Sequence, residues 1–246
     1  MNPHTIRPLT VLEGVEFEKS FMTYLTNIGE KALLEGYIWY IQGPKENIIV
    51  DTGVKPESFT LLRALFKDSG AHQPRFYTPE EALGRIGLSP QDIDLVIVTH
   101  LHFDHIEQGE KYNRAKFIIQ RDELDYALNP HPSQALFLQK ATFEHLNFEV
   151  IEGDCEIVAG VKVLLTPGHT HGGQSVAVKT DKGTTVIAGL CTINENFYPP
   201  DHLKDIMPVI TPAIHKDPCQ AYDSLLRIKE IADTIYPLQQ SGLSRL

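Results

Sequence analysis

His100-Leu101-His102-Phe103-Asp104-His105 is the stretch that decides how the rest of this sequence is interpreted. It places three imidazoles and one carboxylate within six residues, directly after the apolar run 94–99, which is typical of a strand covered on both faces. Metal-competent side chains are costly to bury without a partner, and a metal ion supplies one. In an extended segment His100 and His102 point to the same side, so both can reach one ion.

The composition limits the classes of protein to which the chain can belong. Its 246 residues are 42% hydrophobic, which favours one α/β domain over residues 1–246. The net charge of −10 repels phosphate and anionic lipid, so we expect neither a nucleic-acid nor a membrane partner. No apolar run is long enough to span a bilayer, and residues 1–12 lack a signal-peptide core, so we expect a cytoplasmic protein.

The cysteines and the apolar periodicity indicate a reduced protein of alternating strands and helices. Cys155, Cys191 and Cys219 are odd in number and far apart, which predicts free thiols rather than a disulfide framework or a CxxC motif. We expect strands over residues 37–41, 47–50, 94–99, 116–120, 148–151, 156–158, 161–165, 174–179, 184–188 and 234–236. We expect helices over residues 57–67, 79–86, 122–128 and 133–146, and one that begins at Asp217-Pro218.

Three motifs, taken in order, resemble the metallo-β-lactamase superfamily. They are Asp51-Thr52-Gly53, the HxHxDH stretch, and Thr166-Pro167-Gly168-His169-Thr170. The resemblance implies a four-layer αββα sandwich of the α/β class, with a metal site at one edge between the two sheets. Residues 17–25 and 214–218 further resemble the N-acyl homoserine lactonase branch.

The resemblance also implies roles for individual residues. His100, His102 and His169 match the ligands of a first metal, and Asp104 and His105 match ligands of a second. Three neutral imidazoles with an open fourth position are also the usual ligands of a catalytic zinc ion. Asp51 matches a buried aspartate beside the site, where we expect it to orient a ligand.

Two positions depart from the family pattern. The acid that bridges both metals would fall at Leu190, and the final histidine at Gln239. Leucine cannot bind a metal and a neutral amide binds zinc poorly. Whether Cys191 or Gln239 contributes to the site stays open, because a buried thiol needs no metal to explain it. The tyrosine that follows the bridging acid in the lactonase branch is absent from Thr192-Ile193-Asn194. We therefore predict one firmly held zinc and a weakened second position, with iron or manganese as alternatives.

The expected function is that of a metal-dependent hydrolase. A metal-activated water would attack a small ester, lactone or activated aromatic substrate. Asp104 is the candidate proton acceptor, and His105 would hold Asp104 or assist proton transfer. Phe21 and Met22 are the candidate substrate contacts.

One alternative is an iron-dependent oxygenase of the same fold, which would need Asp104 in place of the missing acid. Another is a non-catalytic metal-binding subunit. The oligomeric state stays open, with a homodimer or another oligomer as the alternatives to a monomer.

Overall fold

Twelve strands and six α-helices build the part of the chain that the computed structural model describes, residues 3–43, 45–65 and 74–245. The strands are β1 Thr5–Glu18, β2 Lys31–Gln42, β3 Asn47–Val50, β4 Arg75–Phe76, β5 Leu95–Ile97, β6 Lys116–Gln120, β7 Phe148–Ile151, β8 Cys155–Val158, β9 Val161–Leu165, β10 Gln174–Thr180, β11 Gly183–Ala188 and β12 Thr234–Pro237. The helices are α1 Pro56–Leu65, α2 Pro79–Gly84, α3 Phe103–Ile106, α4 Arg121–Leu128, α5 Asn194–Phe197 and α6 Pro218–Ile231.

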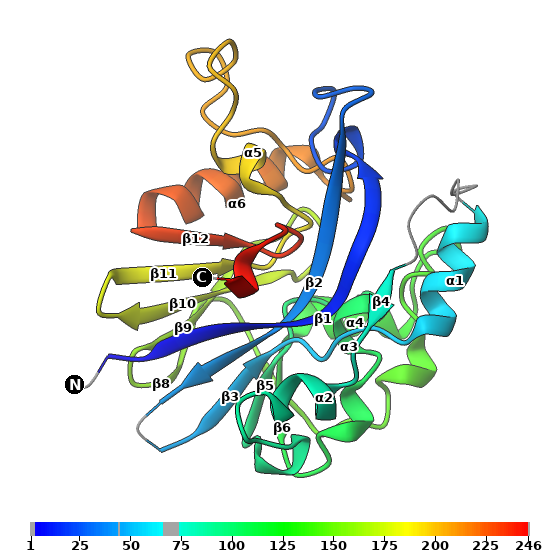
Figure 1. Cartoon of the computed structure of the whole chain (residues 1–246), viewed down its shortest axis with the longest axis vertical. Helices are drawn as coiled ribbons and strands as arrows, with labels where there is room; N and C mark the ends of the chain where they lie inside the picture. Colours follow the sequence, from blue (N-terminus) through cyan, green and yellow to red (C-terminus); the bar gives the residue numbers. More distant parts are fainter. Residues whose placement is uncertain (1–2, 44, 66–73, 246) are drawn as a thin grey trace.

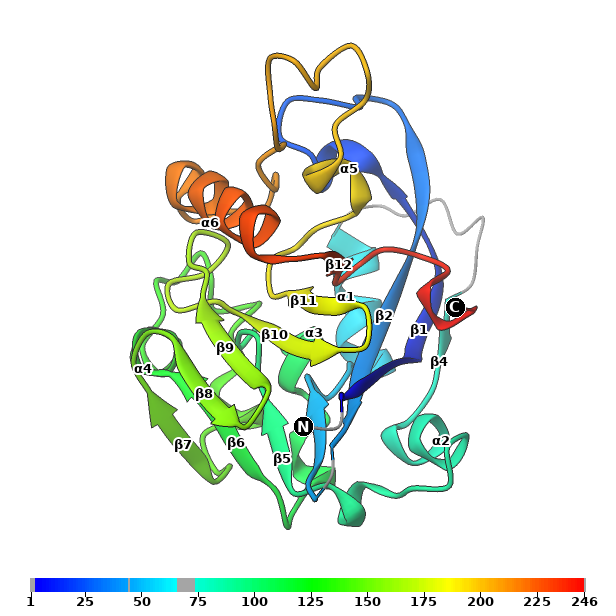
Figure 2. The same ribbon diagram turned by 90° about the vertical axis from the view of Figure 1, so that its left-hand side faces the viewer.

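The strands form two sheets that lie face to face, with helices on the outer faces (Figure 1). The larger sheet has the order β4-β1-β2-β3-β5-β6-β7, and the smaller one the order β12-β11-β10-β9-β8. Figure 2 shows the strands of the smaller sheet side by side, with α6 lying next to β12. The αββα sandwich expected from the sequence is confirmed.

The alternation of side chains along β2 explains why the sheets are covered on both faces. Successive residues of a strand face opposite sides. Trp39 and Ile41 pack between the two sheets, where they meet valines of β9 and β10. Ile38 and Tyr40 lie in a second apolar cluster, together with side chains from α2, α3 and α4. Each face of this strand therefore removes apolar surface from water, which is the main force that holds the layers together.

Helix α6 covers the outer face of the smaller sheet. Its spacing places Ala221, Leu225 and Ile228 on one face, where they pack against β11 in a third apolar cluster. Asp217 caps the helix, because its carboxylate accepts hydrogen bonds from the Cys219 and Gln220 amides. The helix start predicted at Asp217-Pro218 is confirmed.

Parallel pairing brings three functional segments to one edge of the larger sheet. Strands β3, β5 and β6 run parallel to one another, so their carboxyl ends lie together. Asp51 follows β3, His100 comes shortly after β5, and Glu123 lies in α4, which follows β6 directly. The connectivity thus collects these polar side chains at one place before any side-chain contact is considered.

Two expectations about the elements need correction. The helix predicted over residues 133–146 is wrong, because this segment forms turns and a short 3-10 helix over Lys140–Thr142. The Phe137 carbonyl accepts the amide of Phe103 at 2.9 Å, so it is used by a distant segment rather than within a helix. No strand was predicted before residue 37, whereas β1 pairs along β2 with register shifts around Leu12.

The remaining helix expectations agree with the structure where it describes them. The helix predicted over residues 57–67 is found as α1, and residues 66–67 lie outside the described residues. Thr78 caps α2 with the expected reciprocal pair to Glu81. Within residues 3–43, 45–65 and 74–245, no helix has the length and apolar character needed to cross a membrane.

Candidate metal centre

Three buried histidines meet at the edge between the two sheets. One ring nitrogen from each of His100, His102 and His169 lies within 4.8 Å of the others. The Nε2 atoms of His100 and His169 are 3.2 Å apart, and each of these two rings stands nearly perpendicular to that of His102. His100 comes just after β5, His102 precedes α3, and His169 lies in the loop between β9 and β10. In the described part of the chain, this is the one group of at least three side chains arranged to hold a metal ion.

The surroundings of these rings favour their neutral, metal-binding form. Burial, followed by the charges of neighbouring histidines, holds the pKa of His100 well below its ordinary value. Burial and the charge of His169 lower the pKa of His102 to about 3, and burial lowers that of His169 to about 4. Each ring can therefore offer a lone pair at neutral pH. Three neutral imidazole nitrogens around one point fit a zinc ion with an open fourth position.

Neighbouring oxygens fix the orientation of two of these rings. His169 donates from Nδ1 to the Ile214 carbonyl at 2.6 Å, which leaves Nε2 as the lone pair that faces His100. The Nδ1 atom of His100 lies 3.0 Å from the Thr99 hydroxyl. That hydroxyl lies 2.9 Å from Oδ2 of Asp51, so the His100 ring is held through an intermediate residue. The expectation that Asp51 lies beside the site agrees with this arrangement.

His105 lies between two carboxylates. Its Nδ1 atom is 2.7 Å from Asp51 and its Nε2 atom is 3.2 Å from Asp104. Burial lowers the pKa of His105, but the charges of Asp104 and Asp51 outweigh burial and raise it to about 10. In this structure Asp104 and His105 thus pair with each other, and both ring nitrogens of His105 are used outside the group of three histidines.

The structure also locates the residues at the two departures from the family pattern. Leu190 is fully buried in the apolar cluster beneath α6. Two hydrogen bonds join Gln239 to Thr192. The backbone amide of Gln239 donates to the Thr192 carbonyl, and the side-chain oxygen of Gln239 accepts the Thr192 backbone amide at 2.8 Å. The Cys191 sulfur lies 3.2 Å from the sulfur of Met22. Burial, with a smaller effect of the Asp104 charge, raises the pKa of the Cys191 thiol.

The two candidate substrate contacts lie in different environments. Met22 is buried in a small cluster with Leu34, Cys191 and Ile193. Phe21 is 43% exposed, and its ring packs against that of Phe17. Neither Phe21 nor Met22 lines the cavity that opens beside the three histidines.

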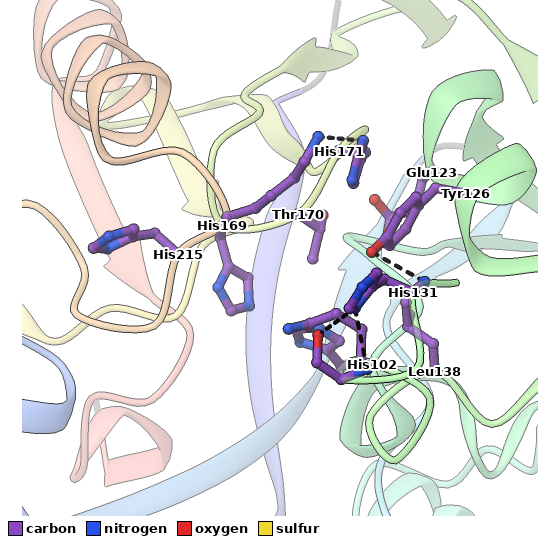
Figure 3. A pocket seen from close by; sticks show the side chains of 12 residues that line it. His102, Glu123, Tyr126, His131, Leu138, His169, Thr170, His171 and His215 are labelled. Atoms are coloured by element: carbon purple, nitrogen blue, oxygen red, sulfur yellow. Dashed lines mark hydrogen bonds between the residues drawn. The ribbon is translucent and has the colours of Figure 1, made fainter. Parts of the chain in front are cut away.

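That cavity has a volume of about 270 Å³ and adjoins His102 and His169 (Figure 3). The other residues that line it are Glu123, Tyr126, His131, Ser133, Gln134, Leu138, Thr170, His171, His215 and Lys216. Tyr126 and His131 carry no sequence signal, whereas Lys216 falls within residues 214–218, which resemble the lactonase branch. Tyr126 is half-buried on α4 and His131 lies in the loop that follows, where no periodicity marks them. Glu123 was also missed, although Ala127, four residues on, is a buried partner on the same helix face.

Glu123 connects α4 to both loops that carry metal-binding histidines. One of its oxygens accepts the Leu101 amide and the other accepts the Gly172 amide, each at 2.9 Å. A Cβ atom at Gly172 would lie 2.3 Å from the Glu123 amide nitrogen, so only glycine allows this approach. Burial raises the pKa of Glu123, and the amide donors offset part of that effect.

Comparison with known proteins gives consistent matches. The sequence model of the metallo-beta-lactamase superfamily matches residues 33–217. The N-acyl homoserine lactonase AiiA of Bacillus thuringiensis subsp. kurstaki is 33% identical over 203 residues, which cover 80% of this chain and 75% of that protein. The crystal structure of a quorum-quenching N-acyl homoserine lactone lactonase has a TM-score of 0.74 at 25% identity, covering 98% and 94% of the two chains. The dizinc lactonase AidC, with a TM-score of 0.69 at 16% identity over 98% and 89%, shows the fold alone.

Proposed function

We propose, from the premise that this chain belongs to the metallo-beta-lactamase superfamily and is a hydrolase of that fold, that it cleaves a small ester, lactone or activated aromatic compound with one zinc ion. The observation that carries the proposal is the group of three neutral histidine nitrogens beside an open cavity. The relatives named above are lactonases, which supports a carbonyl carbon as the point of attack. They also favour a hydrolase over an oxygenase or a non-catalytic subunit.

His100, His102 and His169 would hold the ion. When bound there, zinc supplies a Lewis acid that polarises the substrate oxygen and lowers the pKa of a water molecule to about 7. The residues around the ligands keep them in place, since the Ile214 carbonyl fixes one ring and Glu123 joins the two loops.

Asp104 and His105 would handle the attacking water. Burial raises the pKa of Asp104, but the charge of His105 and its hydrogen bond outweigh burial, and the net pKa lies below the ordinary value. Asp104 is therefore ionised and can accept a hydrogen bond from the water and so orient it, whereas its lowered pKa makes it a weak acceptor of the proton. His105, itself held by Asp51, would fix the position of the Asp104 carboxylate.

The proposal of one ion rests on how the remaining candidate ligands are used. Leu190 offers no donor atom, and the Gln239 side chain already accepts the Thr192 amide. Asp104 and His105 satisfy each other, with Asp51 as the further partner. Holding a second ion would require these groups to exchange their present partners for the metal.

Metal analysis together with substitution of His169 tests this proposal. We expect protein purified without added metal to contain about one equivalent of zinc, and His169→Ala to lose most metal and hydrolysis. The exposed His202 provides the control, because His202→Ala should change neither. Two equivalents of metal would overturn the single-ion proposal, and full metal content in His169→Ala would overturn the ligand assignment. No turnover across lactones, esters, thioesters and activated aromatic compounds would overturn the substrate classes.

A further inference from the structure

The cavity beside the metal centre presents hydrogen-bond donors on one side. Tyr126 and His131 lie in and just after α4, whereas His171 and Lys216 come from loops on either side of β10 and β11. Figure 3 shows His169 between His215 on one side and Tyr126, His131 and His171 on the other, with His102 below His131 in this view. A substrate held at the metal would therefore extend past Tyr126, His131 and His171 as it enters the cavity.

Lys216 supplies the positive charge in this group. Its Nζ atom lies 2.5 Å from Nδ1 of His171 and 5.9 Å from the centre of the Tyr126 ring. Among the described residues, none of the ion pairs includes Lys216. Glu123 is the nearby acid, and each of its oxygens already accepts a backbone amide. Lys216 is thus an exposed ammonium with no carboxylate in ion-pair contact, in a protein whose net charge is −10.

The two neighbouring histidines also present donors rather than acceptors. An ammonium group can only donate, so Nδ1 of His171 is the acceptor and the proton of the neutral ring lies on Nε2. That Nε2 atom is buried and has no hydrogen-bond partner in the protein. The Ser133 amide donates to Nδ1 of His131, which likewise leaves Nε2 of His131 as the donor. His215 differs, because its Nδ1 atom pairs with the Pro212 carbonyl.

We propose that Lys216, His171 and His131 bind a carboxylate group of the substrate, so that the enzyme favours esters or lactones that carry a carboxylate besides the bond that is cleaved. One ammonium and two neutral N–H donors suit a group with a single negative charge better than a phosphate dianion. The volume of about 270 Å³ lies just below the usual range for small-molecule sites, so a short acyl chain fits better than a long one. This inference rests on the proposed function, because it concerns which substrates the proposed hydrolysis prefers.

A pair of esters of equal chain length tests the selectivity. We compare kcat/KM for mono-4-nitrophenyl glutarate, which ends in a carboxylate, with that for 4-nitrophenyl pentanoate, which ends in a methyl group. The wild type should prefer the glutarate ester by about tenfold or more, and Lys216→Met should remove that preference. Lys216→Arg should retain most of it, and Lys182→Met, at an exposed turn away from the cavity, should leave it unchanged. Equal use of both esters by the wild type, or an unchanged ratio in Lys216→Met, would overturn the assignment.

Direct binding separates this inference from the proposed hydrolysis. The metal-loaded protein is titrated calorimetrically with pentanoate and with pentanamide, at about pH 8, where free imidazole is neutral. Because the metal is present in both proteins, the difference between wild type and Lys216→Met reports the contribution of Lys216 to binding. Pentanoate should bind about tenfold more weakly to Lys216→Met, with no such change for pentanamide. If neither ester is cleaved but this difference in pentanoate binding is found, the proposed hydrolysis of esters is overturned and the carboxylate site is retained. If pentanoate binds both proteins equally, the carboxylate site is overturned whether or not the esters are cleaved.

Discussion

At the scale of single residues, Asp51 lies beside the three histidines and is held by contacts with Thr99 and His105. Its backbone has a positive φ of 60°, a conformation that Asp and Asn tolerate better than most residues. Its carboxylate accepts the Thr99 amide at 2.8 Å and also lies against the Thr99 hydroxyl and His105. Three donors converge on this one buried side chain.

Replacing Asp51 by Asn should therefore destabilise the fold although the size and backbone preference are kept. The amide group of Asn turns one acceptor into a donor and leaves the buried His105 with a weaker partner. We expect a loss of about 1–3 kcal/mol in the free energy of unfolding. Urea denaturation in the presence of a chelator measures it, with Asp201→Asn as the exposed control. Asp201 is a surface partner of Lys204, so the control should change stability by less than about 0.5 kcal/mol. Equal stabilities of the two variants would show that the Asp51 contacts are not needed.

The cysteines should differ strongly in reactivity. Cys191 is buried and burial raises the pKa of its thiol, whereas Cys219 is exposed at the start of α6. The thiolate is the reactive form, so Cys191 should react slowly with a disulfide reagent in the folded protein. We expect Cys219→Ser to remove the fast phase of thiol release and Cys191→Ser to leave it intact. Loss of the fast phase in Cys191→Ser would instead indicate an accessible thiolate beside the site, and it would restore Cys191 as a candidate metal ligand.

At the scale of elements, α4 holds the two histidine-bearing loops in register. Glu123 is the contact that does this, because it joins the amides of Leu101 and Gly172. Substitution by Gln removes the charge and places an NH₂ group against one of these amides. Glu123→Gln should therefore weaken zinc affinity by about 10–100-fold, as loss of an outer contact typically does.

A competition assay with a chromogenic chelator measures that affinity in Glu123→Gln and in a matched variant of the same helix. Asp125 is exposed on α4, so Asp125→Asn should bind zinc as the wild type does. A purely structural role for Glu123 would lower the midpoint of unfolding and leave the affinity of the folded protein unchanged. That result would contradict the positioning role.

The elements also show why some features follow from the sequence and others do not. The segment from His100 to His105 is short and dense, so local pattern alone indicates a metal site. His169 lies some 70 residues away, and only the resemblance of its loop joined it to that segment. The apolar spacing over residues 133–146 predicted a helix that does not form. The Phe137 carbonyl instead accepts the Phe103 amide, a contact that no local pattern contains. Lys216 falls within residues 214–218, but its position beside His171 depends on packing between distant loops, which no local pattern contains.

At the scale of the whole molecule, two groups of histidines give the metal-free protein opposite responses to pH. Burial holds the pKa of His102 at about 3 and that of His169 at about 4 in the folded chain, below the ordinary 6.5. As pH falls below 6.5, the unfolded chain takes up these protons first, so stability decreases by up to about 1.4 kcal/mol per pH unit for each group. His105 has a folded pKa of about 10, because its carboxylates outweigh burial. Its contribution is complete below pH 6.5 and is lost as the pH rises toward 10.

The free energy of unfolding of the metal-free protein should therefore be greatest near pH 6.5 and decrease on both sides. Urea titrations with a chelator, between about pH 5 and pH 9, measure this profile. His105→Gln should lose the decrease on the alkaline side, and His169→Ala should lessen the decrease on the acid side. Added zinc binds the neutral imidazoles in competition with protons. It should therefore shift the decrease in the free energy of unfolding on the acid side to lower pH. A steady rise in stability from pH 5 to pH 9 would mean that His105 is not held as a cation between Asp51 and Asp104, and Asp104 would then lose the partner that keeps it ionised.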